Sequence, residues 1–299
     1  MSPAKRAGYV ALLGRPNVGK STLLNRLLAQ KISITSPKPQ TTRHAILGIK
    51  TLPDTQIVYV DTPGLHGNAR RAMNRYMNRT AGSVLSYVDV AVLLVEGLRW
   101  TEEDDGVIRR MMDFKGAVIL AVNKVDRISN KAELLPFLEQ ASEKREFANL
   151  VPISALRGDN LDALERVIAG LLPESEFLFS EDQVTTASER FIAAELIREK
   201  LTRRLREEIP YALTVEIEHF KDEKRLLRIG AIIWVERAGQ KAIVIGEKGS
   251  TLKDIGSQAR EDMEIIFGRK VFLETWVKVR EGWSDDERAL HSFGYQDSF

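Results

Sequence analysis

"GRPNVGKS", residues 14–21, carries two glycines, a lysine and a serine at the spacing G-x-x-x-x-G-K-[ST]. Because a strand-like apolar run precedes the stretch and a helical pattern follows it, its backbone N–H groups can turn onto phosphate oxygens. Gly14 and Gly19 allow that close approach of the backbone. Lys20 would reach the β- and γ-phosphates, and the Ser21 hydroxyl would ligate Mg²⁺. The stretch therefore predicts a nucleotide site.

The chain has 299 residues, enough for two domains, and its 43% hydrophobic and 29% charged residues are typical of a globular protein. A formal charge of +2 says little about partners. The lack of cysteine excludes disulfides, cysteine metal ligands and a thiol nucleophile. With neither a signal-like start nor an apolar run long enough to span a bilayer, we expect a cytoplasmic protein; peripheral membrane contact stays open.

Short apolar runs alternate with amphipathic stretches over the first half of the chain. Strand–helix alternation of this kind predicts an α/β domain with a mostly parallel sheet and helices on both faces, over residues 1–172. An additional strand at 45–50 would pair antiparallel at the edge. The other strands are expected at 9–14, 56–61, 90–96, 117–123 and 150–154, and the helices at 20–30, 69–86, 103–114, 131–144 and 160–171.

Near residue 172 the pattern changes. Residues 173–188 are acidic and aperiodic, which indicates a linker. Residues 189–299 then predict a small α+β domain, with helices at 189–208 and 252–267, strands at 213–220, 226–236 and 271–279, and a glycine-containing apolar run at 242–249. The first of these helices carries six basic residues that would face solvent or extend a nucleic-acid surface: Arg190, Arg198, Lys200, Arg203, Arg204 and Arg206.

Two further short motifs follow predicted strands. "DTPG", residues 61–64, would let Asp61 hold Mg²⁺ through water and let the Gly64 N–H approach a γ-phosphate, although alone it is more often a turn. "NKVD", residues 123–126, ends in Asp126, whose carboxylate can accept two hydrogen bonds from guanine. Adenine offers no such pair, and an unpaired buried carboxylate is costly. A helix-capping role for this aspartate is the ordinary alternative.

The last motif of the set is "VPISAL", residues 151–156, where the Ala155 N–H could meet the guanine O6. All the motifs occur in order, each at the end of a predicted strand, so they fall on the edge of the sheet where ligands bind. The ordered set resembles the translation-factor class of P-loop GTPases. The nucleotide-binding residues are then Asn17, Val18, Gly19, Lys20, Ser21, Thr22, Asp61, Gly64, Asn123, Lys124, Asp126, Ser154, Ala155 and Leu156.

In that class, the segment between the first helix and the second strand is a mobile switch with a Mg²⁺-binding threonine. Here it is "SITSPKPQTTRHAILGI", residues 33–49. The resemblance favours Thr42 as the ligand, with Thr41 the next choice. The predicted Mg²⁺ ligands are then Thr42 together with Ser21 and Asp61.

A glutamine that orients the attacking water in Ras-like members is replaced here by Leu65, and no arginine finger is identifiable. No catalytic residue is therefore certain; Lys20, Thr42 and Gly64 would position the γ-phosphate and water. We expect slow intrinsic hydrolysis, with kcat below about 1 s⁻¹, raised by RNA, the ribosome or K⁺. Asn17 is either a K⁺ ligand, as in related GTPases with a hydrophobic residue after the motif, or a turn residue. His66, next to Leu65, is expected to be an exposed loop residue rather than a base.

The second domain contains "GEKG", residues 246–249, before an amphipathic helix. Such a glycine turn lets a nucleic-acid backbone approach, and the predicted contacts are Gly246, Glu247, Lys248, Gly249 and Lys253. Residues 221–260 hold nine basic and five acidic residues, a net +4, whereas residues 261–299 hold five and nine, a net −4. Positive charge therefore gathers around the turn, although an ordinary β-turn on a solvated basic face is equally consistent.

The order α-β-β-α-α-β with G-x-x-G between two helices resembles a type II KH domain, which makes residues 242–245 a short helix although their propensity favours a strand. With "QTTRH" and the terminal "WVKVREGWSDDERAL", nearly the whole chain resembles the bacterial Era family. The resemblance implies binding of GTP, GDP and Mg²⁺, binding to the 3′ end of small-subunit ribosomal RNA, help in small-subunit assembly, a monomer, and in some members peripheral inner-membrane association. The tail at 283–290 would dock RNA or the other domain.

Two other functions remain to be distinguished. A P-loop kinase or ATPase would use the same phosphate loop, but Asp126 predicts that GTP binds far better than ATP. The other alternative is a GTPase whose second domain binds protein or lipid. Replacing Gly246 and Gly249 with aspartate should abolish RNA binding and spare GTP binding, whereas unchanged RNA affinity would favour this alternative.

Overall fold

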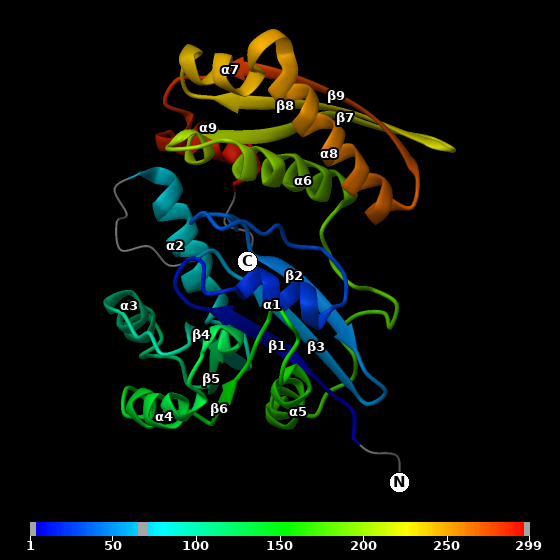
Figure 1. The fold of residues 1–299 in the computed structure, drawn as a ribbon. Helices are drawn as coiled ribbons and strands as arrows, with labels where there is room; N and C mark the ends of the chain where they lie inside the picture. The colour runs from blue at the N-terminus through cyan, green and yellow to red at the C-terminus, as the bar shows by residue number, and fades with distance from the viewer. Residues whose placement is uncertain (1–3, 65–70, 296–299) are drawn as a thin grey trace.

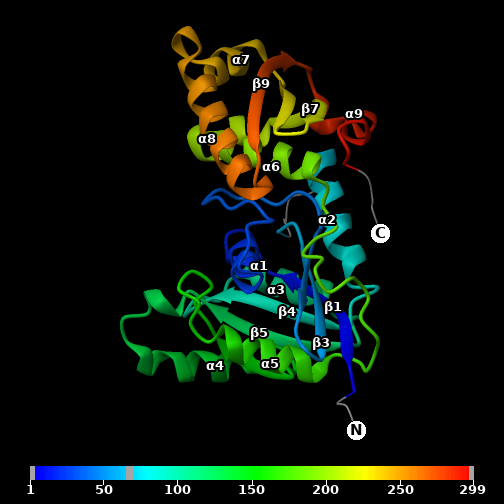
Figure 2. The ribbon, with the colours of Figure 1, turned by 90° about the vertical axis from the view of Figure 1, so that its right-hand side faces the viewer.

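In the computed structural model, which describes residues 4–64 and 71–295, the chain forms two bodies stacked one above the other. The α/β body holds the N-terminal half, and the smaller α+β body sits over one end of it (Figures 1 and 2). Leu65 and His66, which bear on hydrolysis, lie outside the described residues.

The first body is built on a six-stranded sheet in the order β2-β3-β1-β4-β5-β6. Only β2 is antiparallel, at the edge, as predicted. Leu12 pairs with Asp61, and Glu96 pairs with Asn123, so the carboxyl ends of these strands meet at one edge. The strands are β1 (Arg6–Leu13), β2 (Ile46–Thr51), β3 (Thr55–Asp61), β4 (Val90–Glu96), β5 (Ala117–Asn123) and β6 (Asn149–Pro152).

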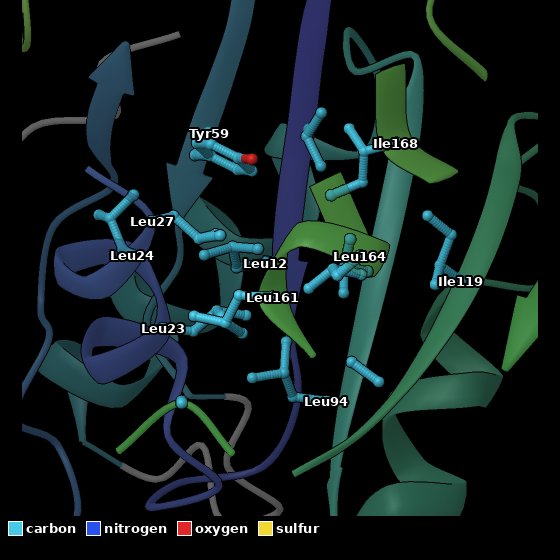
Figure 3. Packing of buried hydrophobic residues seen from close by; sticks show 14 of the residues in the cluster. Leu12, Leu23, Leu24, Leu27, Tyr59, Leu94, Ile119, Leu161, Leu164 and Ile168 are labelled. Atoms are coloured by element: carbon cyan, nitrogen blue, oxygen red, sulfur yellow. The ribbon is translucent and has the colours of Figure 1, made fainter. Parts of the chain in front are cut away.

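Helices cover both faces of this sheet because its strands are apolar on both sides. The helices are α1 (Lys20–Leu27), α2 (Ala72–Val84), α3 (Glu102–Arg110), α4 (Leu134–Ser142) and α5 (Leu161–Leu171). Leu12 points to the face that α1 and α5 cover, where Leu23 and Leu164 pack (Figure 3). Leu13 points to the opposite face, toward α2, α3 and α4. The helix expected at 131–144 is interrupted, since residues 131–133 form a 3₁₀ turn before α4.

The connection between the bodies is attached to the sheet. Ile49 of β2 donates its N–H to the carbonyl of Val184 (2.7 Å). Gln56 donates to the Phe179 carbonyl (2.9 Å) and accepts from the Leu178 and Phe179 N–H groups. The aperiodic stretch predicted as a linker therefore covers the exposed edge of the sheet, which would otherwise be open to pairing with another chain.

The second body has a three-stranded sheet in the order β7-β8-β9, with β8 and β9 parallel. Its elements are α6 (Glu189–Arg204), β7 (Leu213–Glu223), β8 (Leu226–Val235), α7 (Ala238–Ile245), α8 (Ser250–Phe267) and β9 (Lys270–Val279). Ile197 of α6, Ile233 of β8 and Met263 of α8 share its core. Residues 242–245 are helical, as the family resemblance implied and against their propensity.

The tail joins the two bodies. Trp283 is fully buried and donates its indole N–H to the Ala212 carbonyl (3.2 Å). After a short helix that the sequence did not predict, α9 (Glu287–Ser292), Tyr295 packs with Met73 and Met77 of α2. Of the two roles considered for the tail, the structure shows docking onto the other domain.

The basic residues of α6 correct another prediction. Arg198 is 2% exposed and Lys200 is 9% exposed, so these two do not belong to a solvated charged face. The other four, Arg190, Arg203, Arg204 and Arg206, are exposed as expected. Helix α6 lies at the junction of the two bodies, where the guanidinium of Arg198 pairs with Glu195 (2.6 Å). The helix also ends at Arg204, four residues before the predicted end at 208.

Candidate functional site

A cavity of about 370 Å³ opens at the carboxyl edge of the six-stranded sheet. Most of the predicted nucleotide residues line it, namely Asn17, Gly19, Lys20, Ser21, Thr22, Thr42, Gly64, Asn123, Lys124, Asp126, Ala155 and Leu156. Val18, Asp61 and Ser154 are buried outside that lining. The strand ends thus bring together motifs that span more than 130 positions of sequence.

The phosphate loop requires glycine at both predicted positions. Gly14 has φ +146°, and a Cβ there would lie 2.6 Å from the Leu94 carbonyl oxygen. Gly19 has φ +107°, and its Cβ would lie 2.3 Å from the side-chain nitrogen of Asn123. Both contacts are too short for any side chain, so the loop is packed tightly against β4 and the residue that ends β5.

Lys20 lies folded within this loop. Its ammonium donates to the carbonyls of Gly14 (2.9 Å) and Arg15 (3.1 Å). Burial, opposed by Asp61 and assisted by Arg15, lowers the pKa of Lys20 to about 8. A polyphosphate beside this ammonium would supply the negative charge that burial leaves unbalanced, so anion binding and protonation of Lys20 favour each other.

The predicted Mg²⁺ ligands converge. The Ser21 hydroxyl donates to Asp61 Oδ2 (2.7 Å) and lies 2.8 Å from the Thr42 hydroxyl, which lies 3.4 Å from the same carboxylate oxygen. Burial raises the pKa of Asp61, although Lys20 and three hydroxyls oppose that shift. The other carboxylate oxygen, Oδ1, is buried and has no hydrogen-bond partner among the described residues.

An oxygen-only site of this kind suits Mg²⁺, which takes one or two protein ligands and completes its shell with phosphate oxygens and water. In the described part of the chain, no group of three His, Asp or Glu side chains could hold a metal alone. The residues present therefore fit a Mg²⁺ ion that arrives with a polyphosphate. Thr41 also lines the cavity, but its hydroxyl donates to the Lys38 carbonyl (2.7 Å) instead of joining the group around Asp61.

Ser33 was not predicted. It is fully buried and donates to Asp61 Oδ2 (2.8 Å), alongside Ser21. It lies in the segment named as the switch, but only the folded contact distinguishes it from the other hydroxyls there.

Hydrogen bonds within the protein hold the side chains of the base-recognition motif, residues 123–126, in place. Asn123 donates to the Val18 carbonyl (2.7 Å) and accepts from the Ala155 N–H (2.9 Å), so it connects the phosphate loop, β5 and the last motif. The Ala155 N–H, which we expected to meet the guanine O6, is therefore already engaged by Asn123. Asp126 accepts from the Ser154 hydroxyl (2.6 Å), which orients its carboxylate.

Glu96, at the end of β4, is a second feature that sequence reasoning missed. Its carboxylate pairs with Arg15 (3.0 Å) of the phosphate loop and with Lys124 (3.2 Å) of the base motif. Burial alone would raise the pKa of Glu96, but hydrogen bonds and charge from Lys124 and Arg15 lower it overall. Glu96 thus ties the two loops that would hold opposite ends of a nucleotide.

The glycine turn of the second body lies between α7 and α8. Gly246 (φ +73°), Lys248 (φ +49°) and Gly249 (φ +80°) all have positive φ. A Cβ on Gly246 would lie 2.2 Å from the Thr251 hydroxyl, whereas Gly249 faces open space. Glu247 and Lys248 are exposed in the turn, and Lys253 is exposed on the first turn of α8. A ligand backbone can approach this turn closely.

Comparison with known proteins gives these sites their context. Residues 9–124 match the family model described as 50S ribosome-binding GTPase, and residues 208–284 match the KH domain model. GTPase Era of Azotobacter vinelandii is 59% identical over 293 residues, covering 98% of each chain. The chain belongs to the Era family. It is accordingly a GTPase, which hydrolyses GTP to GDP and phosphate.

Further Era proteins agree. GTPase Era of Pseudomonas aeruginosa is 59% identical over 292 residues, covering 98% of this chain and 96% of that one. A solved structure of Era in complex with MgGDPNP and nucleotides 1506–1542 of 16S ribosomal RNA has a TM-score of 0.92 at 40% identity, covering 97% of this chain and 99% of that one. A variant of Aquifex aeolicus Era bound to GDP·AlF4⁻ has a TM-score of 0.91 at 39% identity over the same shares. Among the described residues, no helix is long and apolar enough to cross a membrane.

Proposed function

We propose that this chain is a slow GTP-driven switch that binds the 3′ end of small-subunit ribosomal RNA and assists assembly of the small ribosomal subunit. The observation that carries the proposal is the pairing of two sites in one fold. A pocket lined by the phosphate loop and by Asp126 lies on the sheet edge, and an open G-x-x-G turn lies in a KH domain. The Era structure with an RNA fragment from that region supports the choice of RNA.

For the nucleotide site, we propose the residues predicted from the sequence, with Mg²⁺ between Ser21, Thr42 and Asp61. The closeness of these three side chains and the unpartnered Oδ1 of Asp61 support this ligand set. Bound Mg²⁺ would neutralise charge on the phosphate oxygens. Lys20 would place its ammonium on the β- and γ-phosphates, and the Gly64 N–H would approach the γ-phosphate.

For the RNA site, we propose that the turn at 246–249 and Lys253 grip single-stranded RNA. Positive φ at Gly246 and Gly249 supports close approach, and the exposed Lys248 can meet a phosphate. Crosslinking the GTP-bound protein in a lysate and sequencing the attached RNA tests this. We expect enrichment of the small-subunit 3′ end, and less of it when Lys248 and Lys253 are both replaced by alanine. Fragments spread evenly over the ribosomal RNA would contradict the proposal.

We further propose that Asn17 ligates K⁺ beside the phosphates, which supplies positive charge in place of an arginine finger. Asn17 has φ +62°, and its amide nitrogen donates to the Pro37 carbonyl (2.9 Å), so the amide oxygen is the atom that would ligate the ion. Hydrolysis should be several-fold faster in K⁺ than in Na⁺ at equal ionic strength, with kcat in Na⁺ below about 1 s⁻¹. Asn17→Ala should abolish the difference; equal rates for the unaltered protein would refute the K⁺ site.

Domain limits, assembly state and location complete the proposal. We place the GTPase domain at 1–172, the linker at 173–188 and the KH domain with its tail at 189–299. The end of α5 at Leu171 and the start of α6 at Glu189 support these limits. We propose a monomer in the cytoplasm that can associate peripherally with the inner membrane. Family resemblance alone supports these last points.

A further inference from the structure

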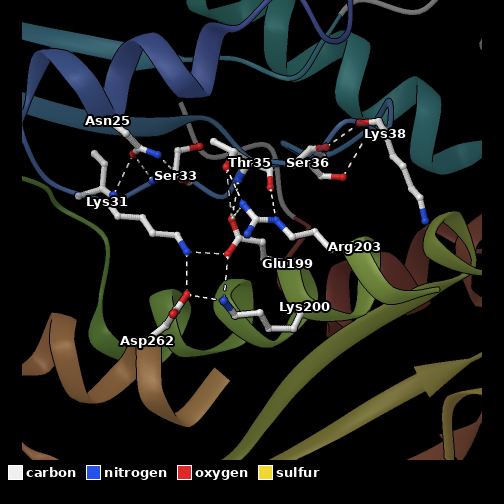
Figure 4. Close-up of polar contacts among 12 residues, drawn as sticks. Asn25, Lys31, Ser33, Thr35, Ser36, Lys38, Glu199, Lys200, Arg203 and Asp262 are labelled. Atoms are coloured by element: carbon white, nitrogen blue, oxygen red, sulfur yellow. Dashed lines mark hydrogen bonds and ion pairs between the residues drawn. The ribbon is translucent and has the colours of Figure 1, made fainter. Parts of the chain in front are cut away.

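Residues 31–43, which include the first part of the switch segment, run between the two bodies and make several polar contacts with the second (Figure 4). Lys31 pairs with Glu199 of α6 (2.6 Å) and with Asp262 of α8 (2.8 Å). The Thr35 N–H donates to Glu199 (2.9 Å), and Arg203 donates to the Thr35 carbonyl (3.0 Å). Glu199 is fully buried, so these partners replace the water that its carboxylate has lost. The first part of the segment is thus fixed to the KH domain.

The residues on either side of Thr42 are fixed in the same way. The Thr41 carbonyl accepts from the guanidinium of Arg198. Arg43, which is fully buried, donates to the carbonyls of Leu213 (2.8 Å) and Pro210 (3.0 Å). The same guanidinium also lies 3.3 Å from the phenol oxygen of the tail residue Tyr295. Both peptide neighbours of Thr42 are therefore held by groups of the second body.

The contacts of Thr41 and Arg43 matter for the proposed Mg²⁺ site because they restrain the backbone on both sides of Thr42. Thr42 is only 6% exposed, and its hydroxyl lies 2.8 Å from the Ser21 hydroxyl. Ordering a free loop costs about 1–2 kcal/mol per residue, and that cost is removed from nucleotide binding when other contacts already order the loop. The contacts of Arg43 thus place a ligand where Mg²⁺ and a γ-phosphate would meet it.

We propose that Arg43 is a positioning residue for GTP hydrolysis: by inserting into the KH domain, it presents Thr42 to the Mg²⁺ of bound GTP. The inference rests on the proposed role of Thr42 as a ligand. GDP lacks the γ-phosphate and does not need the segment to be closed. If Arg43 has a positioning role, replacing it should lower the affinity for the triphosphate and not for GDP. If its contacts only join the two domains, the two affinities should change equally or not at all.

The test measures affinities of the full-length protein for a non-hydrolysable GTP analogue and for GDP, both with Mg²⁺, by calorimetry. Arg43→Ala should weaken binding of the analogue about tenfold, because ordering one freed residue costs about 1–2 kcal/mol, and should leave GDP affinity within about twofold. The kcat for GTP should fall by a similar factor. Arg43→Lys keeps the charge but cannot serve two carbonyls in the same geometry, so its loss should be intermediate.

The matched control is Arg145→Ala. Arg145 also donates to two backbone carbonyls, Met111 (2.8 Å) and Phe114 (3.2 Å), but within the first body and away from the switch segment. It should change neither affinity. If Arg43→Ala does not fold, Tyr295→Phe replaces it as the test, since it removes a single oxygen. A lower affinity for the analogue alone supports the inference. Equal decreases in both affinities, or no decrease, overturn it.

Thr42→Ala separates this inference from the proposed ion site. If Thr42→Ala weakens the analogue selectively while Arg43→Ala does not, the anchor inference fails and the ligand assignment stands. If Thr42→Ala leaves the ratio of the two affinities unchanged, the ligand assignment itself fails. Equal losses of GDP and analogue in Arg43→Ala would overturn the positioning role.

Discussion

Asp126→Asn is expected to lower the affinity for GTP about a thousandfold and to make xanthosine triphosphate the better ligand. The carboxylate would accept hydrogen bonds from the guanine N1–H and the exocyclic amine. Each bond to a charged group contributes about 1.5–3 kcal/mol, so losing both costs roughly two to four powers of ten. The asparagine amide would also face the guanine amine with its own N–H₂ group, whereas xanthine presents a carbonyl there.

The substitution Asp126→Asn should leave the local structure unchanged. Asp126 is held by the Ser154 hydroxyl, and an asparagine oxygen can keep that bond. Titration calorimetry with GTP, XTP and ATP would measure the change. Asp159→Asn is the matched control, because Asp159 is an exposed carboxylate in the neighbouring loop and its loss changes the net charge equally. A variant that still prefers GTP, or an unaltered protein that binds ATP as tightly, would rule out guanine reading by Asp126.

Gly249→Asp should weaken RNA binding at least about a hundredfold and leave GTP affinity unchanged. Gly249 has φ +80°, and an added Cβ would meet no heavy atom within 4 Å. Aspartate is one of the few residues that enter this backbone region at modest cost. Its carboxylate would stand where a phosphate approaches, and like charges in contact cost several kcal/mol, which corresponds to more than a hundredfold.

Gly268→Asp controls for both the charge and the backbone conformation. Gly268 also has positive φ (+63°) and open space around its Cβ position, but it caps the far end of the 18-residue α8, about 27 Å from Gly249. Gly246 is a poorer site, since a Cβ there would lie 2.2 Å from the Thr251 hydroxyl and would disturb the turn. Binding to a 3′-end oligonucleotide, measured by fluorescence anisotropy, gives the result. Undiminished binding by Gly249→Asp would favour a protein or lipid partner.

Features that depend on the order of strands and motifs along the chain could be predicted from the sequence. The carboxyl ends of parallel strands share an edge, so ordering the motifs along the chain was enough to bring Lys20 and Asp126 into one pocket and to place Asp61 next to Ser21, which lines it. The helix at 242–245 needed the family resemblance, because β-branched apolar residues favour a strand when considered alone. Its helical form depends on packing against the second core.

The sequence could not reveal contacts between residues distant along the chain. Arg43 binds carbonyls about 170 positions away, and the buried charges of α6 looked like ordinary surface residues until the two bodies met. Asn123 illustrates the same limit at closer range. Its motif predicts a nucleotide contact, and Asn123 does line the cavity, but the motif gave no sign of the bonds by which it also connects Val18 and Ala155. Such pairings depend on three-dimensional proximity, which composition and periodicity do not encode.

The contact between Arg43 and Tyr295 joins positions 252 residues apart, so it has a consequence for biosynthesis. At about 5–20 residues per second, roughly 13–50 seconds pass between the translation of the arginine and that of the tyrosine. A nascent chain can fold its first domain during that interval, but it lacks the last partner of the guanidinium. The complete set of Arg43 contacts can therefore form only after the whole chain has been synthesised. Translation that stops before Tyr295 would release a protein that lacks this contact.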